Sequence, residues 1–446
     1  MTISKNLLDL LACPVSGNPL SIADKELTDQ ESGSTYPIID GIPWLLPNPQ
    51  NSLLDWSVKL NHFHQVLHSE IGQLETAIDA TTGLTQERLQ KLHAGKISFT
   101  RTVFELLTPI VRNPMAGKAV YDALNDIAPN TQNLLSYEAN LYRDWVWGQE
   151  ENDLCRDIVY QHIDASRCEK ILVLGAGAGR LAWDIHQSIK PDMTVTTDIN
   201  PLLVLAAQQI MKGKGLTIHE FPEQPILSEH VAIEHHIKGL TVADNFHSVF
   251  SDANKPSFQK GSFDTLITPW FIDIQPLEFS RFLKQLNQYI SIGDQWINFG
   301  SLVFNQQRDA FCYSIDEVKA IAKEQGFEIE AISQQQIPYL KSPYNAGHRI
   351  ENIWSWSARK TKDVDSITDT QVLPEWLRDM KKAIPKTDDF KEFSARHRLY
   401  AQLGAEVDGR TSIQKISNKL AKQRNIDKDE ASKLVRNLFI DLIRVR

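Results

Sequence analysis

The sequence predicts an α/β fold in which helices cover a twisted sheet. Between residues 168 and 360, apolar runs such as KILVLGAG (170–177) and QWINFGSLVF (295–304) alternate with segments of helical periodicity. This alternation is typical of a sheet layered with helices. The first run ends in three alternating glycines and leads into an amphipathic segment, which is the pattern of a strand, a nucleotide-binding turn and a helix.

Composition and periodicity divide the chain into four parts. Residues 1–50 hold short apolar segments punctuated by Gly and Pro, which predicts a small, self-contained β-rich domain. Residues 51–165 have helical periodicity and form a predicted helical extension, and residues 166–360 form the α/β domain. A polar stretch at 360–371 is typical of a linker, and residues 372–446 are predicted to form a helical C-terminal domain.

Composition narrows the classes of partner. A net charge of −9 over 446 residues argues against nucleic acid as the main partner, because phosphate binding needs an excess of Lys and Arg. The four cysteines form no CxxC pair, which favours a reducing compartment and gives no zinc framework. No apolar run has the length of a membrane span, and the first residues lack the layout of a signal peptide. We therefore expect a cytoplasmic protein with no membrane partner and no metal.

The glycine turn favours one class of nucleotide. Gly175, Gly177 and Gly179 are followed by Arg180 at the position where a dinucleotide fingerprint has Gly or Ala for close packing of helix on strand. An Arg there predicts a wider turn, which suits a nucleoside without phosphate, as in S-adenosylmethionine. The alternative is a plain strand-to-helix turn that binds nothing.

Two acids follow the next apolar runs. Asp198 ends MTVTTD, 23 residues after Gly175, where a carboxylate can accept hydrogen bonds from both ribose hydroxyls of NAD or S-adenosylmethionine. Asp252 follows a second run and is placed to bind an adenine amino group. The structural alternative for Asp252 is a helix N-cap or an Asx-turn.

Five motifs occur in the order found in one enzyme family. They are RDWVWGQEENDLC (143–155), VLGAGAGRLAWDI (173–185), IHEFPEQP (218–225), FDTLITPWFIDI (263–274) and WINFGSLVF (296–304). Over about residues 130–360 they resemble the carnosine N-methyltransferase family, a branch of the class I S-adenosylmethionine-dependent methyltransferases. The resemblance implies a Rossmann-like, seven-stranded and mostly parallel sheet, with S-adenosylmethionine as cofactor and an imidazole nitrogen of a histidine-containing dipeptide as methyl acceptor.

The resemblance also implies the cofactor site. Arg143 would bind the methionine carboxylate, a bidentate task suited to a guanidinium group. Asn140 stands where the family usually has a Gln, and Pro269 replaces a family Cys. The cofactor-binding residues that the motifs imply are Asn140, Arg143, Gly175, Gly177, Gly179, Asp198 (ribose), Asp252 and Ala253 (adenine), and Pro269.

Asp273 matches the family acid that hydrogen-bonds the substrate imidazole. Methyl transfer from a sulfonium is an in-line displacement, so the enzyme mainly aligns the nucleophile. A carboxylate that accepts the imidazole N–H fixes the tautomer, leaves the other nitrogen free to attack, and stabilises the developing positive charge. The alternative is that Asp273 caps the following helical segment, QPLEFSRFL.

The chain departs from the family at the substrate pocket. Aligned on ARK, the stretch HRIENIWSWSARK (348–360) has His348 and Glu351 where the family has tyrosines, so the acceptor is not expected to be carnosine itself. The predicted substrate-binding residues are Phe271, Asp273, Tyr339, Tyr344, His348 and Glu351.

Both flanking segments resemble known domains. The first 50 residues resemble the zinc-ribbon-like domain that activates certain tRNA and protein methyltransferases, but Cys13 stands without a CxxC partner because Ser16 takes its place, so we expect no zinc. The segment from DGRTS (408–412) onward resembles winged-helix domains that bind leader peptides of modified peptides. A helical dimerisation cap fits the same pattern, so a leader peptide and a second copy of the chain are alternative partners.

The leading hypothesis is an S-adenosylmethionine-dependent N-methyltransferase acting on an imidazole-bearing small molecule or peptide. One alternative keeps the cofactor and takes tRNA or a protein as acceptor; another is a catalytically silent, S-adenosylmethionine-binding regulatory protein. The histidines at 64, 68, 230, 235 and 236 have no HExxH-like context and are interpreted as solvated helix residues.

Overall fold

The computed structural model describes residues 3–23, 26–111, 134–240, 244–304, 309–367, 398–399, 401–407 and 410–444. They fall into two compact units, Met1–Val372 and Leu373–Arg446, which are treated separately. Residues 112–133 of the predicted helical extension, the end of the predicted linker from residue 368, and the first part of the predicted C-terminal domain, to residue 397, lie outside the described residues.

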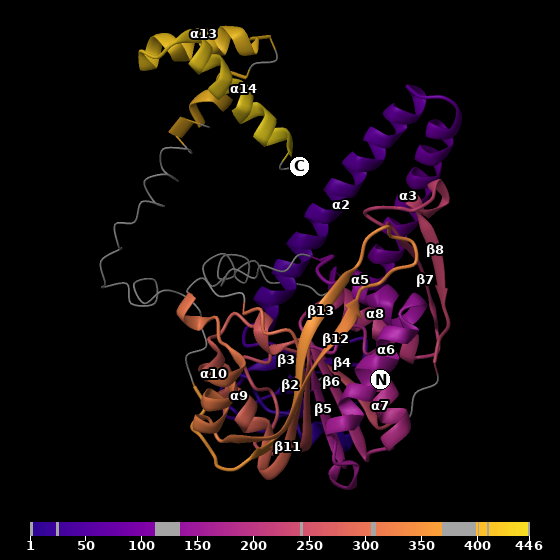
Figure 1. The fold of residues 1–446 in the computed structure, drawn as a ribbon, viewed down its shortest axis with the longest axis vertical. Helices are drawn as coiled ribbons and strands as arrows, with labels where there is room; N and C mark the ends of the chain where they lie inside the picture. Colours follow the sequence, from indigo (N-terminus) through magenta and orange to yellow (C-terminus); the bar gives the residue numbers. More distant parts are fainter. Residues whose placement is uncertain are drawn as a thin grey trace. The chain divides into compact units, whose positions relative to one another are not determined.

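Seven strands form the central sheet of the first unit (Figure 1). They are β5 (Lys170–Leu174), β6 (Met193–Asp198), β9 (Phe246–Ser251), β10 (Phe263–Pro269), β11 (Ile290–Gly300), β12 (Phe327–Tyr339) and β13 (Arg349–Lys360). Their order is β9-β6-β5-β10-β11-β13-β12, and only β13 runs antiparallel to its neighbours. The predicted Rossmann-like, mostly parallel sheet is confirmed.

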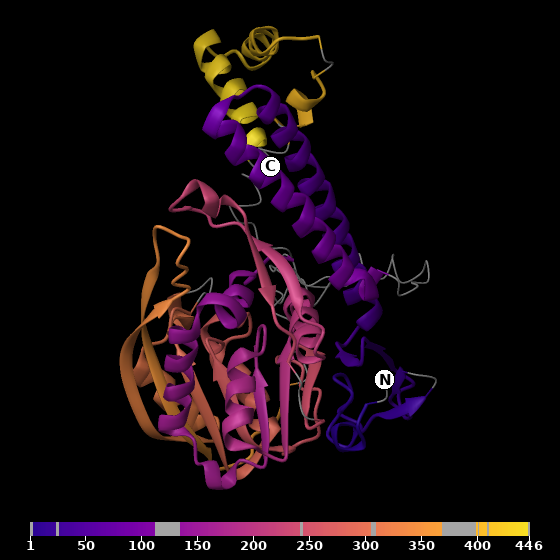
Figure 2. The same ribbon diagram turned by 90° about the vertical axis from the view of Figure 1, so that its right-hand side faces the viewer.

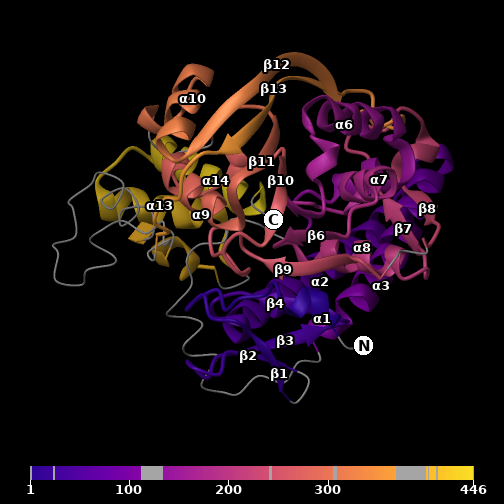
Figure 3. The ribbon, with the colours of Figure 1, turned by 90° about the horizontal axis from the view of Figure 1, so that it is seen from below.

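Helices cover both faces of this sheet (Figure 3). The covering helices are α6 (Gln149–His162), α7 (Arg180–Ile189), α9 (Phe279–Tyr289) and α10 (Ile315–Glu324). In β5, Leu172 and Leu174 pack in one core with residues of α9 and α10, whereas Ile171 and Val173 pack in another with residues of α6 and α7. A strand buried on both faces needs apolar side chains at every position, which explains the uninterrupted apolar run before the glycine turn.

The helical extension forms an antiparallel pair beside the sheet (Figure 2). Its elements are α2 (Pro49–Asp79), α3 (Gly83–Val111), α5 (Ala139–Tyr142) and the π-helix η1 (Arg143–Trp147). Trp56 of α2 and Phe99 of α3 share a core with α8 (Pro201–Met211) and with the hairpin of β7 (Leu216–Glu220) and β8 (Ile233–Ile237). Short 3-10 turns are η2 (Ala165–Arg167), η3 (Ser228–Val231), η4 (Ile272–Ile274) and η5 (Asp309–Phe311).

The N-terminal domain extends the central sheet. It consists of α1 (Lys5–Leu8), β1 (Ser21–Ala23), β2 (Glu26–Thr28), β3 (Thr35–Ile39) and β4 (Ile42–Leu45). The sequence predicts a self-contained domain, but β4 pairs in parallel with β9, and the sheet grows to eleven strands. The physical reason is that β9 is the outer strand of the seven, and β4 supplies partners for backbone groups that an edge strand leaves unpaired.

We expect the contact between β4 and β9 to contribute strongly to the stability of the first unit. Trp44 stacks on Phe250 with ring centroids 3.9 Å apart, and both side chains are buried. We expect Trp44→Ala to lower the free energy of unfolding by about 3–5 kcal/mol, because a cavity replaces a buried aromatic ring. Urea denaturation followed by circular dichroism measures this, with Ile22→Ala at an exposed position of β1 as the matched control. An unchanged midpoint for Trp44→Ala would show that the domain contact does not stabilise the unit.

Asp29 joins two turns of the N-terminal domain. Its carboxylate is fully buried, and Oδ2 accepts hydrogen bonds of 2.6 Å from the hydroxyls of both Ser16 and Ser32. The Cys13 Sγ atom lies 3.0 Å from the Tyr36 hydroxyl. One thiol beside two hydroxyls is not a zinc-binding donor set, since structural zinc sites use four Cys or His ligands. Hydrogen bonds to Asp29 therefore hold these turns together, and the described residues contain no group of three or more His, Cys, Asp or Glu placed to bind a metal.

This arrangement predicts a pH-dependent stability that is insensitive to chelators. The Ser16 and Ser32 hydroxyls hold the pKa of Asp29 well below its usual range. A lowered pKa contributes stability above the unfolded-state pKa, about 3.9, and the contribution is lost as the pH falls through the folded-state pKa. We expect Asp29→Ala to melt at a lower temperature than wild type at pH 7, with the difference shrinking towards pH 3. EDTA should shift neither curve, and Glu26→Ala on β2 is the control. A drop in the wild-type melting temperature with EDTA would contradict the assignment.

The second unit contains two described helices, α13 (Ile413–Arg424) and α14 (Lys428–Arg444). Its core gathers Leu403, Ile416, Leu420, Ala431 and Val435. Ser412 caps α13 through its hydroxyl, which accepts a hydrogen bond from the backbone N–H of Lys415.

In the part of the chain that the structure describes, no helix combines the length and apolar character needed to cross a membrane.

Candidate functional site

The predicted cofactor residues gather at the carboxyl ends of the central strands. In open parallel sheets, ligands bind in the crevice at this edge. Gly175, Gly177 and Gly179 follow β5 with φ values of 62°, 56° and 81°, a region that L side chains rarely adopt. A Cβ at Gly175 would clash with the ring of Phe271, whereas a Cβ at Gly177 would meet nothing within 4 Å. The turn thus packs against the protein at Gly175 and faces open space at Gly177.

Asp198 at the end of β6 shapes the glycine turn. Its Oδ2 atom accepts a hydrogen bond of 2.9 Å from the Gly177 backbone N–H, and Oδ1 accepts one of 2.8 Å from the Asn200 N–H. Burial raises the pKa of Asp198. Each carboxylate oxygen has a second lone pair, so Asp198 can still accept from ribose hydroxyls.

Asp252 and Ala253 follow β9, beside β6 in the sheet. The Asp252 Oδ1 atom accepts hydrogen bonds of 2.9 Å from both the backbone N–H and the side-chain amide of Asn254. This is the Asx-turn that the sequence leaves open as an alternative. Ala253 is buried, and its carbonyl accepts a hydrogen bond of 3.3 Å from the Tyr289 hydroxyl. Pro269 is the buried last residue of β10.

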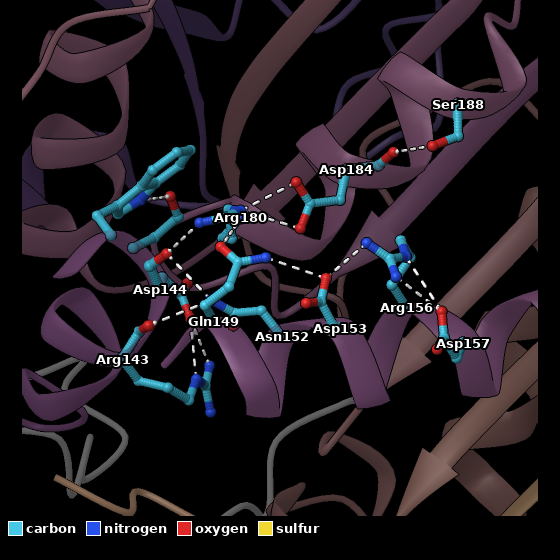
Figure 4. Close-up of polar contacts among 12 residues, drawn as sticks. Arg143, Asp144, Gln149, Asn152, Asp153, Arg156, Asp157, Arg180, Asp184 and Ser188 are labelled. Carbon is cyan, nitrogen blue, oxygen red and sulfur yellow. Dashed lines mark hydrogen bonds and ion pairs between the residues drawn. The ribbon is translucent and has the colours of Figure 1, made fainter. Parts of the chain in front are cut away.

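Arg143 begins the π-helix and lies between two acids, Asp144 and Glu151; Figure 4 shows the contact with Asp144. Its Nε and Nη2 atoms donate to Asp144 Oδ1 at 2.9 and 2.8 Å, and Nη1 lies 3.5 Å from Glu151 Oε1. Burial opposes the charge, but Asp144 and Glu151 raise the pKa of Arg143 above its ordinary value. The guanidinium therefore stays charged within the protein and can bind an anionic group. π-Helical turns of this kind occur frequently at functional sites.

Arg180 links the glycine turn to the π-helix, as Figure 4 shows. Its Nε atom lies 2.9 Å from both carboxylate oxygens of Asp184, Nη1 donates to the Asp144 carbonyl at 2.9 Å, and Nη2 donates to Gln149 Oε1 at 2.8 Å. From the sequence alone, Arg180 argues only against a dinucleotide. The i,i+4 spacing was the local signal that could have predicted its ion pair with Asp184. The bonds to Asp144 and Gln149 connect distant segments and have no local signature.

Asn140 and Tyr137, which precede Arg143 in the chain, also border the site. Asn140 lies on α5, and its buried Oδ1 atom has no hydrogen-bond partner within the described part of the chain. Tyr137 is 42% exposed, with a φ of 64°. Asn200, the cap of α8, donates from its side chain to the Ser136 carbonyl at 2.8 Å and so anchors this segment beside Asp198. Burial raises the pKa of Tyr137, and the charges of Asp273 and Asp198 add to the effect. Nothing in the local sequence singles it out.

Asp273 is held in the turn η4, directly after β10. Its Oδ2 atom accepts hydrogen bonds from the Ser301 hydroxyl at 2.8 Å and from the Val303 N–H at 3.2 Å. Burial raises the pKa of Asp273. The alternative of a helix cap is wrong, because α9 is capped by Glu278, whose side chain accepts from the Ser280 and Arg281 N–H groups.

The other predicted substrate residues divide into two groups. Tyr339 lies near Asp273, because its ring contacts Trp270 at 4.8 Å between centroids and Trp270 precedes Phe271 and the η4 turn. Glu351 belongs to the same group, since it contacts Arg349 at 3.4 Å and the Arg349 guanidinium lies over the Tyr339 ring. Tyr344 instead packs on His230 and His235, with ring centroids 5.2 and 5.7 Å away. His348 is exposed ahead of β13.

The interpretation of the histidines as solvated helix residues is wrong for His235. This residue lies on β8, not on a helix, and is buried with its Nε2 atom 2.7 Å from Glu220 Oε2. Glu220 also accepts hydrogen bonds from Trp147 Nε1 at 3.1 Å and from the Ser342 hydroxyl at 3.3 Å. The pair thus joins the β7–β8 hairpin to the π-helix and to the segment before β13. A strand pattern of alternating residues in IEHHI (233–237) was the signal that could have placed it.

Comparison with known proteins gives two family matches. The family model described as carnosine N-methyltransferase matches residues 127–362, more than half of the chain. The Trm112p-like family model matches residues 4–41. A UPF0434 protein of Pseudomonas putida F1 is 49% identical over 51 residues, 11% of this chain and 84% of that protein.

Solved structures with a similar fold include two methyltransferases. Phosphoethanolamine N-methyltransferase 2 of Haemonchus contortus, bound to phosphomonomethylethanolamine and S-adenosylhomocysteine, is 12% identical with a TM-score of 0.35, covering 53% of this chain and 61% of that one. A methyltransferase in complex with the Haloferax volcanii Trm112 activator is 11% identical with a TM-score of 0.34, covering 51% of this chain and 97% of that one.

Proposed function

We propose, from the premise that this chain belongs to the carnosine N-methyltransferase family, that it methylates an imidazole nitrogen of a histidine-containing small molecule or peptide. As a member of this family it is an S-adenosylmethionine-dependent methyltransferase, and its N-terminal domain is Trm112-like. The identity of the acceptor is the part that we propose.

The residues at the sheet edge fit S-adenosylmethionine. When bound, the cofactor supplies a methyl group carried on a sulfonium sulfur. Asp198 would accept hydrogen bonds from the ribose hydroxyls, and Arg143 would bind the methionine carboxylate. The buried Asn140 Oδ1 atom, which lacks a partner within the described residues, would accept from the amino group. The open space at Gly177 leaves room for the ligand beside the turn.

Asp273 would orient the acceptor. A neutral imidazole has one N–H and one nitrogen with a free lone pair. If the N–H donates to Asp273, the tautomer is fixed and the other nitrogen can attack. The ring gains positive charge as it is methylated, and the carboxylate stabilises that charge. Ser301 and Val303 hold the other carboxylate oxygen, so the group is positioned before the acceptor binds.

A single observation carries this proposal: Asp273 is a buried carboxylate just after β10, with one oxygen anchored by Ser301 and Val303. The test is transfer of tritiated methyl groups by the full-length protein to histidine, carnosine and histidine-containing peptides, with bulk tRNA and denatured protein as comparison acceptors. We expect label on an imidazole compound. Label confined to tRNA or protein would contradict the proposed acceptor.

A further inference from the structure

A second acid, Glu351, lies at the same edge of the sheet as Asp273. In the β12–β13 hairpin, Glu351 of β13 pairs with Ile337 of β12. Three residues later on β13, Trp354 pairs with Gly300, which is the last residue of β11. Glu351 therefore lies beyond the end of β11. The chain segment that leaves β11 at this point carries Ser301 and Val303, which hold Asp273.

Among the residues that the structure describes, the charges near Glu351 are not balanced. The Glu351 side chain is 23% exposed, and in this part of the chain its cationic partner is Arg349, at 3.4 Å. Arg349 is 67% exposed, and its guanidinium also lies over the Tyr339 ring, 4.6 Å from the centroid. Arg143 is already shared between Asp144 and Glu151. Asp273 and Glu351 are thus two carboxylates at the same edge of the sheet, and Arg349, which contacts Glu351, is mostly exposed.

This imbalance favours a cation in the pocket. Asp273 must be ionised to stabilise the positive charge of the methylated ring, and the nearby Glu351 charge works against that ionisation. A positive group on the acceptor would relieve the repulsion and would bind Glu351 through a charge-assisted hydrogen bond. A neutral tyrosine, which the resemblance places at this position in the family, would provide neither effect.

We infer that Glu351 selects acceptors that carry an amine or other cationic group beside the methylated ring. The inference rests on the proposed function, because it concerns the same pocket and the same acceptor. Glu351 is a specificity-determining residue in this account: its charge binds the substituent, whereas Asp273 binds the ring.

A ligand series that separates charge from the imidazole ring tests the inference. The full-length protein, saturated with S-adenosylhomocysteine, is titrated by calorimetry with histamine (imidazole, cationic), 4-methylimidazole (imidazole, neutral), imidazole-4-acetate (imidazole, anionic) and 2-phenylethylamine (cationic, no imidazole). Each titration is repeated with Glu351→Gln. Glu330→Gln is the matched control, because Glu330 pairs with Arg359 at 2.9 Å on the same hairpin, far from its Glu351 end.

We expect wild type to bind histamine more tightly than 4-methylimidazole, and imidazole-4-acetate most weakly. Glu351→Gln should weaken histamine binding about five- to tenfold, as for a partly exposed charge contact, and change 4-methylimidazole binding less than twofold. Glu330→Gln should change neither. Equal histamine affinity in wild type and Glu351→Gln, or tighter binding of imidazole-4-acetate than of histamine, would overturn the inference.

The same series separates this inference from the proposed function. If histamine and 2-phenylethylamine bind equally and both depend on Glu351, the cation preference stands and the imidazole acceptor is wrong. If histamine binds far better than 2-phenylethylamine but ignores Glu351→Gln, the imidazole acceptor stands and the inference fails. Binding of none of the four ligands would overturn both.

Discussion

Asp198→Ala is expected to weaken S-adenosylmethionine binding by roughly 100-fold. The substitution removes a charged acceptor for two ribose hydroxyls, and hydrogen bonds to charged groups contribute about 1.5–3 kcal/mol each. It also frees the Gly177 N–H, which Asp198 Oδ2 holds at 2.9 Å, so the glycine turn loses its anchor. Calorimetric titration with S-adenosylmethionine measures the change.

Two comparisons make the Asp198 result specific. Asp192→Ala, just before the other end of β6, is the matched control and should bind the cofactor like wild type. Burial raises the pKa of Asp198, and binding needs the ionised form, so wild-type affinity should fall as the pH is lowered through that raised pKa. Unchanged affinity in a folded Asp198→Ala protein would remove Asp198 from the cofactor site.

Asp273→Asn is expected to lower kcat/KM for an imidazole acceptor by roughly 10²- to 10⁴-fold, while the dissociation constant for S-adenosylmethionine stays within about twofold of wild type. The amide keeps the size of the side chain but removes the charge that fixes the tautomer and stabilises the methylated ring. Steady-state methyl transfer and calorimetry on the same preparation give the two numbers.

Ser301→Ala supplies a graded comparison for the Asp273 result. It removes the hydroxyl that donates to Asp273 Oδ2 at 2.8 Å and leaves the carboxylate in place, so its loss of activity should be smaller than that of Asp273→Asn. Because burial raises the pKa of Asp273, wild-type activity should decline as the pH falls through this pKa. Loss of cofactor binding in a folded Asp273→Asn protein would mean that Asp273 serves the cofactor or the structure rather than the acceptor.

Local patterns were enough to predict the central sheet. The apolar run of β5, the glycine turn and the amphipathic α7 each follow from residues within about ten positions of one another. The addition of β4 to β9 could not be predicted this way. Pairing between strands 200 residues apart depends on which edge is left open, and no local pattern of a single sequence records that.

The site follows the same division. Asp198 ends β6 and Asp273 lies in the turn after β10, so both could be placed from strand patterns together with the family motifs. Arg180 and Tyr137 could not, because their positions depend on contacts between the helical extension and the α/β domain. The role of Tyr344 in substrate binding stays a prediction; its ring packs on His230 and His235 of the β7–β8 region, a contact that no local pattern indicates.

The position of the methyl group on the product tests directly whether an imidazole nitrogen is the acceptor. Wild-type protein is incubated with S-adenosylmethionine carrying a ¹³C methyl group and with histidine-containing acceptors labelled with ¹⁵N in the ring. Nuclear magnetic resonance then shows which atom carries the new methyl group. We predict a ¹³C–¹⁵N bond between the transferred methyl group and one ring nitrogen. A methyl group on an amine, a carboxylate or any atom outside the ring would contradict it.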